Sequence, residues 1–168
     1  MISSFVHGKV YVFIDVSNVF YSQRTLGWKV AYAKLMRYLK RECGEGMKCF
    51  AYAAVDENNL AERKFLDMLD INGYILRTKA LKEIKTNEGN KHKGSLDIEL
   101  AFEMVELAEK YDTAVLVSGD SDFAPALERL KQRGKRVIVM STRGRVGKEL
   151  LNLAKFVDLR KLKAEISQ

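Results

Sequence analysis

Cysteine and histidine are scarce in this chain, and each scarcity argues against a class of chemistry. The two cysteines, Cys43 and Cys49, are too few and too close together for a disulfide framework or a thiolate metal site. They indicate small buried thiols in a cytoplasmic protein. The two histidines, His7 and His92, lack the spacing of an HExxH-type ligand pair, and a Ser-His-Asp hydrolase would have to recruit one of them.

Long hydrophobic runs are missing as well. The longest apolar runs have the length of a strand, and the N-terminus shows no charged segment followed by an apolar stretch. The sequence therefore predicts neither a membrane partner nor a targeting segment. With one proline and no flexible low-complexity linker, the 168 residues are expected to form one domain over residues 1–168, with its core at about 10–158.

Acidic residues are outnumbered by basic ones. Lys plus Arg number 29 against 22 for Asp plus Glu, which gives a formal net charge of +7 and a pI near 9.4. Such an excess favours polyanionic partners, and nucleic acid is the commonest of these. A basic protein with no such partner is the alternative that composition leaves open.

Apolar, β-rich segments alternate with helical patterns along the chain. Strands are predicted at Val10–Ile14, Lys48–Val55, Tyr74–Arg77, Ala114–Val117 and Arg136–Met140. Helices are predicted at Ala31–Glu42, Leu60–Ile71, Leu96–Lys110 and Phe123–Arg133. This alternation indicates βαβ units, and hence an α/β fold with a mostly parallel sheet, of order 3-2-1-4-5, and helices on both faces.

Four aspartates stand where a predicted strand ends or a predicted helix begins: Asp15, Asp97, Asp120 and Asp122. In an open α/β sheet, ligands bind beyond the carboxyl ends of the strands, where the strand order reverses. The first and fourth strands would be neighbours there, so the carboxylates should face one cavity. Like charges at close range need a cation, and oxygen ligands favour a divalent metal. A single aspartate at such a place also serves as a helix cap or turn residue.

Asp97 is the aspartate that a purely structural role explains least well. If Ser95 caps its helix, Asp97 falls in the first turn and borders the apolar stripe, where a carboxylate needs a partner. Complementing the helix dipole is the alternative role. Glu99, Glu103 and Glu106 on the same segment fit a solvated helix face.

A carboxylate cluster that holds Mg²⁺ or Mn²⁺, without a cysteine nucleophile or a catalytic histidine, suits hydrolysis of a phosphodiester. Such a metal activates a water and stabilises the leaving alkoxide. Asn18, one helical turn beyond Asp15, is placed to orient a carboxylate, a water or a phosphate oxygen. Its alternative role is to cap a helix that begins near Ser17.

Basic residues lie close to the acidic positions and are candidate contacts for nucleic acid. They are Lys91 and Lys93, which are close in sequence to Asp97, and Arg143, Arg145 and Lys148, which follow the fifth strand. A solvated basic surface is the alternative. The segment from Thr78 to Gly94, which holds the two lysines, shows no clear periodicity and predicts a long basic loop.

Four aromatic residues follow the first aspartate: Phe20, Tyr21, Trp28 and Tyr32. We expect them mainly on an apolar helix face that packs on the sheet, although such rings also stack on exposed bases of a single strand. Trp28 is the best stacking candidate of the four, because it stands between Gly27 and Lys29 in an irregular stretch.

Three blocks of the chain, in this order and spacing, resemble the signature blocks of the NYN domain. They are FIDVSNV at 13–19, KGSLDIELA at 93–101 and VSGDSDF at 117–123. More narrowly, the chain resembles the LabA/DUF88 branch of that family, within the PIN-like nuclease superfamily, from about residue 10 to 158. The resemblance implies a three-layer α/β/α fold and divalent-metal-dependent ribonuclease activity, and our first hypothesis is an RNA endonuclease that cuts single-stranded RNA. It also implies that Asp15, Asp97, Asp120 and Asp122 are metal-binding catalytic positions. Asn18 matches the polar residue of the first block and is implied to be part of the same catalytic site.

Other functions stay open to different degrees. An RNA-binding or regulatory module that keeps the metal pocket but does not cut is the main alternative. A haloacid-dehalogenase-like phosphatase would need a second acid where Ser17 stands, and no GxGxxG follows the first strand as a dinucleotide-binding domain requires. The number of metals, the RNA cut and the oligomeric state, a homodimer included, are not predicted.

Overall fold

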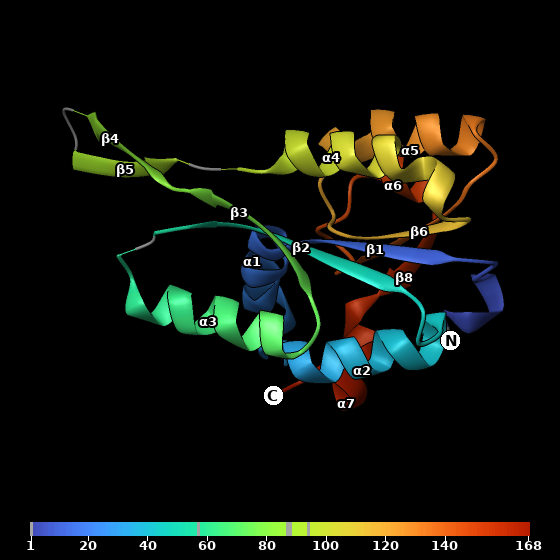
Figure 1. The fold of residues 1–168 in the computed structure, drawn as a ribbon, viewed down its shortest axis with the longest axis horizontal. Coiled ribbons are helices and arrows are strands. Elements are labelled where there is room, and N and C mark those ends of the chain that lie inside the picture. Colours follow the sequence, from blue (N-terminus) through green and yellow to red (C-terminus); the bar gives the residue numbers. More distant parts are fainter. Residues whose placement is uncertain (1, 57, 87–88, 94) are drawn as a thin grey trace.

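The computed structural model of the protein describes residues 2–56, 58–86, 89–93 and 95–168, and for residues 82–86 and 89–93 it describes the backbone alone. A parallel sheet of order β3-β2-β1-β6-β7-β8 forms the middle layer (Figure 1). Its strands are β1 (Val10–Asp15), β2 (Lys48–Val55), β3 (Ile75–Ala80), β6 (Thr113–Val117), β7 (Arg136–Ser141) and β8 (Lys155–Asp158). Counted along the chain, the first five strands of this sheet confirm the predicted order 3-2-1-4-5.

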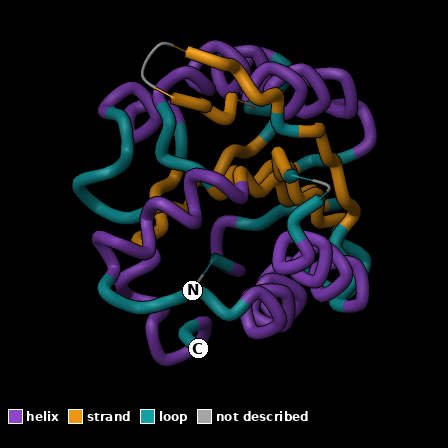
Figure 2. Tube along the Cα trace, turned by 90° about the vertical axis from the view of Figure 1, so that its left-hand side faces the viewer, coloured by secondary structure: helices purple, strands orange, loops and turns teal. Residues whose placement is uncertain are grey.

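Helices cover both faces of the sheet, and the edge-on view in Figure 2 shows them on either side of the strands. One layer holds α1 (Val16–Leu26), α2 (Tyr32–Cys43), α3 (Leu60–Ile71) and α7 (Lys163–Ile166). The other holds α4 (Asp97–Glu106), α5 (Ala124–Gln132) and α6 (Lys148–Leu153). Short 3-10 turns lie at Ser3–Phe5, Leu107–Lys110, Ser121–Phe123 and Leu159–Leu162. Among the described residues, every helix is too short or too polar to cross a membrane.

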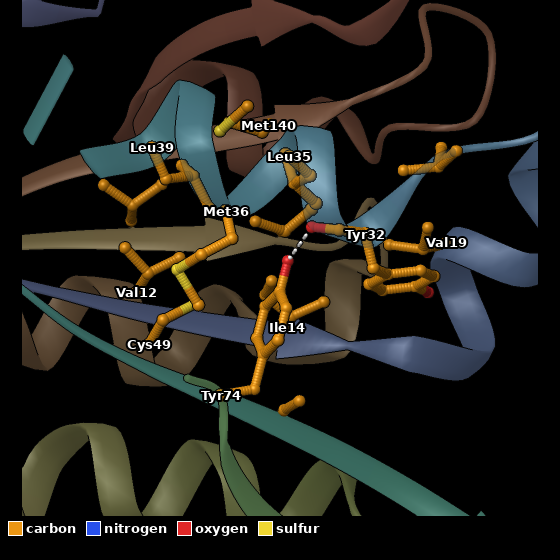
Figure 3. Packing of buried hydrophobic residues seen from close by; sticks show 14 of the residues in the cluster. Val12, Ile14, Val19, Tyr32, Leu35, Met36, Leu39, Cys49, Tyr74 and Met140 are labelled. Atoms are coloured by element: carbon orange, nitrogen blue, oxygen red, sulfur yellow. Dashed lines mark hydrogen bonds between the residues drawn. The ribbon is translucent and has the colours of Figure 1, made fainter. Parts of the chain in front are cut away.

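Strand β1 is the centre of both cores, because all six of its residues are buried. Val12 and Ile14 point into the core beneath α1 and α2 (Figure 3), while Tyr11 and Phe13 point into the opposite core. Each such fully buried apolar side chain contributes about 1.5–3 kcal/mol relative to an exposed one. The strand is thereby held firmly, and its last residue, Asp15, stands at the sheet edge.

The first core contains one polar link between distant segments. The Tyr74 hydroxyl, next to β3, donates a buried hydrogen bond of 2.7 Å to the carbonyl oxygen of Tyr32 at the start of α2 (Figure 3). A buried hydroxyl without a partner would destabilise the fold, so this bond fixes how α2 sits against the sheet.

The segment predicted as a long basic loop is not a loop, and that prediction is wrong. Strand β3 continues to Ala80, and β4 (Lys82–Thr86) pairs antiparallel with β5 (Gly89–Lys93). This hairpin extends away from the six-stranded sheet (Figure 1). Its two strands consist mostly of charged and polar residues. They pair through backbone hydrogen bonds, and such pairing leaves no periodic hydrophobic pattern in the sequence.

Candidate active site

Strands β1 and β6 are neighbours, and they end at the same edge of the sheet. Ile14 pairs with Val117, so Asp15 and the turn Ser118-Gly119-Asp120 follow directly beyond the paired ends. Strands β2 and β3 lie on one side of this pair, and β7 and β8 lie on the other. The predicted switch point is therefore confirmed, and it is the crevice in which α/β folds place their ligands.

The Asp15 carboxylate is buried, with 6% of the residue exposed. Its Oδ1 accepts the Ser17 hydroxyl at 2.7 Å and the backbone N–H of Asn18 at 3.0 Å, which caps helix α1. Its Oδ2 accepts the Ser118 hydroxyl at 3.1 Å. Burial raises the pKa of Asp15 above its ordinary value despite these donors, and the negative charge of Asp97 raises it further. The site thus holds a carboxylate whose charge is costly until a cation compensates it.

Asp97 reaches the same place from the opposite helix layer. It is the first residue of α4 and is half-buried, and its Oδ2 accepts the Ser95 hydroxyl. Its backbone N–H donates to the Ser95 hydroxyl oxygen at 3.2 Å, but the helix-capping position is Leu96, so the predicted cap at Ser95 is off by one residue. Asp15 and Asp97 line both a large pocket and a small cavity beside it, which makes them close neighbours.

The two aspartates of the GDSDF segment, Asp120 and Asp122, have different surroundings in the structure. Asp120 is half-buried and lines the pocket, and its Oδ1 accepts the backbone N–H of Asp122 at 3.0 Å. Asp122 is exposed and is not among the residues that line the pocket. The tight turn over Ser121–Phe123 leaves Asp120 at the pocket and Asp122 exposed, a difference that spacing along the sequence does not reveal.

Gly119 allows the turn that carries Asp120 to sit against the loop after β7. A Cβ atom at this position would lie 2.1 Å from the Arg145 carbonyl oxygen and 2.5 Å from the Ser141 Oγ. The Gly119 carbonyl oxygen accepts the backbone N–H of Gly147 at 2.9 Å. Its own N–H donates to the Asn18 Oδ1 at 3.1 Å. Asn18 therefore ties helix α1 to the Asp120 turn, and the same residue lines the pocket.

The pocket has a volume of about 660 Å³ and is lined by three groups of residues. The first group is the aspartates Asp15, Asp97 and Asp120, the second is the α1 residues Ser17, Asn18, Tyr21, Ser22 and Thr25, and the third is Gly144 and Arg145. Asn18 was predicted as a site residue, whereas Ser17, Ser22 and Thr25 were missed from the sequence, although positions 18, 21, 22 and 25 have the spacing of a single helix face.

Of the five predicted basic contacts, Arg145 is the one placed at the pocket within the described residues. Its Nε donates to the Thr25 hydroxyl at 2.5 Å, which holds the guanidinium against α1. Arg143 and Lys148 are exposed in and after the same loop but do not line the pocket. Lys91 and Lys93 belong to β5, and their side chains lie outside the described residues.

The aromatic prediction is reversed in part. Phe20 and Tyr21 are 58% and 52% exposed, so they do not pack on the sheet as expected. Tyr32 is buried as predicted, and Trp28 is partly buried against the first core, which argues against it as a stacking residue. The α1 pattern misleads because Val16, Val19 and Ser22 are the residues this helix buries.

Glu103 was expected on a solvated face, and that expectation is wrong. Its carboxylate accepts hydrogen bonds from the Arg77 guanidinium, at 2.9 and 3.1 Å from Nε and 2.6 Å from Nη2, and accepts the Tyr52 hydroxyl at 2.8 Å. Burial works to raise the pKa of Glu103, but the bonds from Arg77 and Tyr52 outweigh it and the pKa is lowered. The cluster fastens α4, and with it Asp97, to β2 and β3.

The donor types in the pocket suit a hard divalent cation, because all three acids offer oxygen ligands beside hydroxyl and amide oxygens. A carboxylate has about four acceptor sites, so the hydrogen bonds to Asp15 and Asp120 leave lone pairs free. Across the described residues, however, no three His, Cys, Asp or Glu side chains form a group arranged to hold a metal ion. The chemistry of these residues fits such an ion. Their carboxylates line one pocket, but they do not converge on a single position.

Several known proteins are similar to this chain. The sequence matches the NYN domain family over residues 9–160. It is 33% identical to "Low amplitude and bright protein LabA" of Synechococcus elongatus over 170 residues, which cover 98% of this chain and 91% of that protein. An uncharacterised protein of Methanocaldococcus jannaschii is 37% identical over 82 residues, 46% of this chain and 34% of the other.

A solved structure supports the fold independently. The crystal structure of a protein of unknown function from Vibrio parahaemolyticus matches with a TM-score of 0.77 and 27% identity, and covers 90% of this chain and 93% of that one. The chain belongs to the NYN domain family, which lies within the PIN-like nuclease superfamily. Within that family it is a homologue of LabA.

Proposed function

We propose that the protein is a divalent-metal-dependent ribonuclease that hydrolyses phosphodiester bonds of single-stranded RNA. One observation carries the proposal: Asp15, Asp97 and Asp120, from three distant segments, line one pocket at the switch point of the sheet. Membership of a nuclease superfamily and the net charge of +7 support it.

Asp15, Asp97 and Asp120 would hold Mg²⁺ or Mn²⁺. When bound there, the ion supplies Lewis acidity, which lowers the pKa of a coordinated water and neutralises charge on the phosphoryl oxygens. Ser17 and Ser118 fix both oxygens of Asp15 by hydrogen bonds, so that carboxylate keeps one orientation. Because its lone pairs are only partly used, it remains able to bind a cation.

Arg145 would contact the RNA backbone. Arg145 lines the same pocket as the aspartates, with its guanidinium held by Thr25, and a guanidinium suits bidentate contacts with phosphate. Lys91 and Lys93 on the β4–β5 hairpin, and Arg143 and Lys148 near Arg145, would add further charge along the path of the strand.

A non-catalytic RNA-binding module with the same pocket is the second candidate. It is favoured by one observation, that the described acidic side chains do not already form a metal-binding group. The two candidates differ in turnover. The enzyme must cut RNA in some divalent metal, whereas the module binds RNA in a salt-sensitive way and cuts it in none.

A cleavage screen on labelled single-stranded RNA, with Mg²⁺, Mn²⁺ or EDTA, tests the proposal. We expect cleavage with at least one metal, none in EDTA, and none with Asp120→Asn. Asp67→Asn, an exposed aspartate on α3, is the matched control and should cut like the wild type. Cleavage that persists in EDTA and with Asp120→Asn would refute the proposal, and binding without cleavage in every metal would favour the second candidate.

A further inference from the structure

Two exposed aromatic rings lie against each other, and one of them lines the pocket. Phe20 and Tyr21 are adjacent on α1, with ring centroids 5.7 Å apart and planes at 77°, and Tyr21 itself lines the pocket. They are 58% and 52% exposed, although large aromatic rings lose hydrophobic stabilisation when they stay in water. Their exposure is therefore informative about what binds beside the aspartates.

The surroundings of the two rings are positively charged. The Arg24 guanidinium lies over the Tyr21 ring, 5.6 Å from its centroid, and Arg145 lines the same pocket. An apolar protein partner would have to bury these charges, which is costly when they stay unpaired. A polyanion with flat rings satisfies both features, since its phosphates pair with the arginines and its bases stack on the aromatic rings.

We propose that Phe20 and Tyr21 form a base-stacking platform for an unpaired nucleotide next to the phosphate in the acidic pocket. The inference rests on the proposed function and deepens it, because it assigns the feature that selects single strands. In a duplex, the bases already stack on one another and are paired, so their faces are not free for Tyr21 or Phe20. Phosphate contacts through Arg145 then hold the backbone, while the platform requires a free base.

Binding without turnover tests the platform. The affinity of the full-length protein is measured in EDTA by fluorescence anisotropy, with a single-stranded RNA of about 12 nucleotides and with a duplex of the same length. The double variant Phe20→Ala/Tyr21→Ala should lose about 10-fold to 100-fold in affinity for the single strand. Its affinity for the duplex should stay unchanged. Phe102→Ala, an exposed aromatic of α4 at 67% exposure, is the matched control and should bind both RNAs like the wild type.

Two further measurements keep the result specific to stacking. Tyr21→Trp should retain the affinity for the single strand, because an aromatic face remains. A 2-aminopurine base in the strand should lose fluorescence on binding to the wild type and not to the double variant. Equal single-strand affinity of the wild type and the double variant, or no binding by either, would overturn the platform. A change confined to oligomeric state in size-exclusion chromatography would also overturn it, and would mark a second copy as the occupant.

Failure of the platform and failure of the proposed hydrolysis are distinguishable. If the aromatic pair governs single-strand binding but no metal supports cleavage, the platform stands and the hydrolysis is wrong. If metal-dependent cleavage occurs but the affinity for single-stranded RNA does not depend on Phe20 and Tyr21, the proposed hydrolysis stands and the platform is wrong.

Discussion

The most local test of this architecture is the substitution Gly119→Ala. The added methyl group would lie 2.1 Å from the Arg145 carbonyl oxygen and 2.5 Å from the Ser141 Oγ. Since the first of these atoms belongs to the backbone, the loop after β7 must move away from the Asp120 turn. Overpacking of this kind destabilises a protein by about 1–3 kcal/mol, which lowers the melting temperature of a chain of this size by about 3–10 °C.

The same shift acts on the site, because it strains the hydrogen bond between Gly119 and Gly147 and moves Arg145 relative to Thr25. We expect RNA cleavage to fall by about 10-fold or more, since small displacements at a reacting centre are costly. Differential scanning calorimetry and a cleavage time course measure the two effects.

Gly46→Ala is the matched control for this substitution. Gly46 lies in the exposed turn before β2, has no left-handed backbone angle, and an added methyl group would meet no atom within 4 Å. That variant should melt and cut like the wild type. If Gly119→Ala melted at the same temperature as Gly46→Ala and cut equally fast, the close packing of the Asp120 turn on the Arg145 loop would be refuted.

Three further predictions concern charge. Asp15→Asn should raise the melting temperature in EDTA at neutral pH. Burial raises the pKa of Asp15, so ionisation of this carboxyl group opposes folding as the pH rises. An equally large gain in melting temperature in strong acid would contradict this. Glu103→Gln should lower stability by about 1 kcal/mol at neutral pH, at the low end for charged bonds because Arg77 is partly exposed. Since the pKa of Glu103 is lowered, that loss should shrink as the pH falls through it, which a urea titration at several pH values measures. Lys91→Ala/Lys93→Ala should weaken RNA binding and reduce its salt slope, and an unchanged slope would remove the hairpin from the binding path.

The strand order and the switch point could be predicted because they follow from general rules of α/β topology, and the patterns to which these rules apply are visible in the sequence. Buried parallel strands such as β1 read as continuous apolar runs, and alternation with helices then leaves few topologies. Strand β8 was missed because it has only four residues, with Lys155 exposed and Phe156 and Val157 half-buried, so no hydrophobic period marks it. The β4–β5 hairpin was missed because its pairing depends on the backbone.

The site was predictable at the level of segments and less so at the level of side chains. The sequence predicts that the Asp15, Asp97 and Asp120 segments meet, since each follows a strand end or opens a helix. It does not predict that Asp122 stays outside the pocket, because the direction of a side chain in a 3-10 turn depends on local dihedral angles. The exposure of Tyr21 was likewise hidden, since an aromatic residue on a helix beside a sheet is ordinarily buried.

Cleavage by Asp97→Asn and Asp122→Asn, measured side by side on the same RNA, tests the central claim most directly. Asp97 is far from Asp120 in sequence and meets it only through the fold, whereas Asp122 is two residues away, exposed, and not among the residues that line the pocket. The account predicts a loss of about 100-fold to 1,000-fold for Asp97→Asn and a rate within about threefold of the wild type for Asp122→Asn. Equal losses for both variants, or full activity of Asp97→Asn, would contradict it.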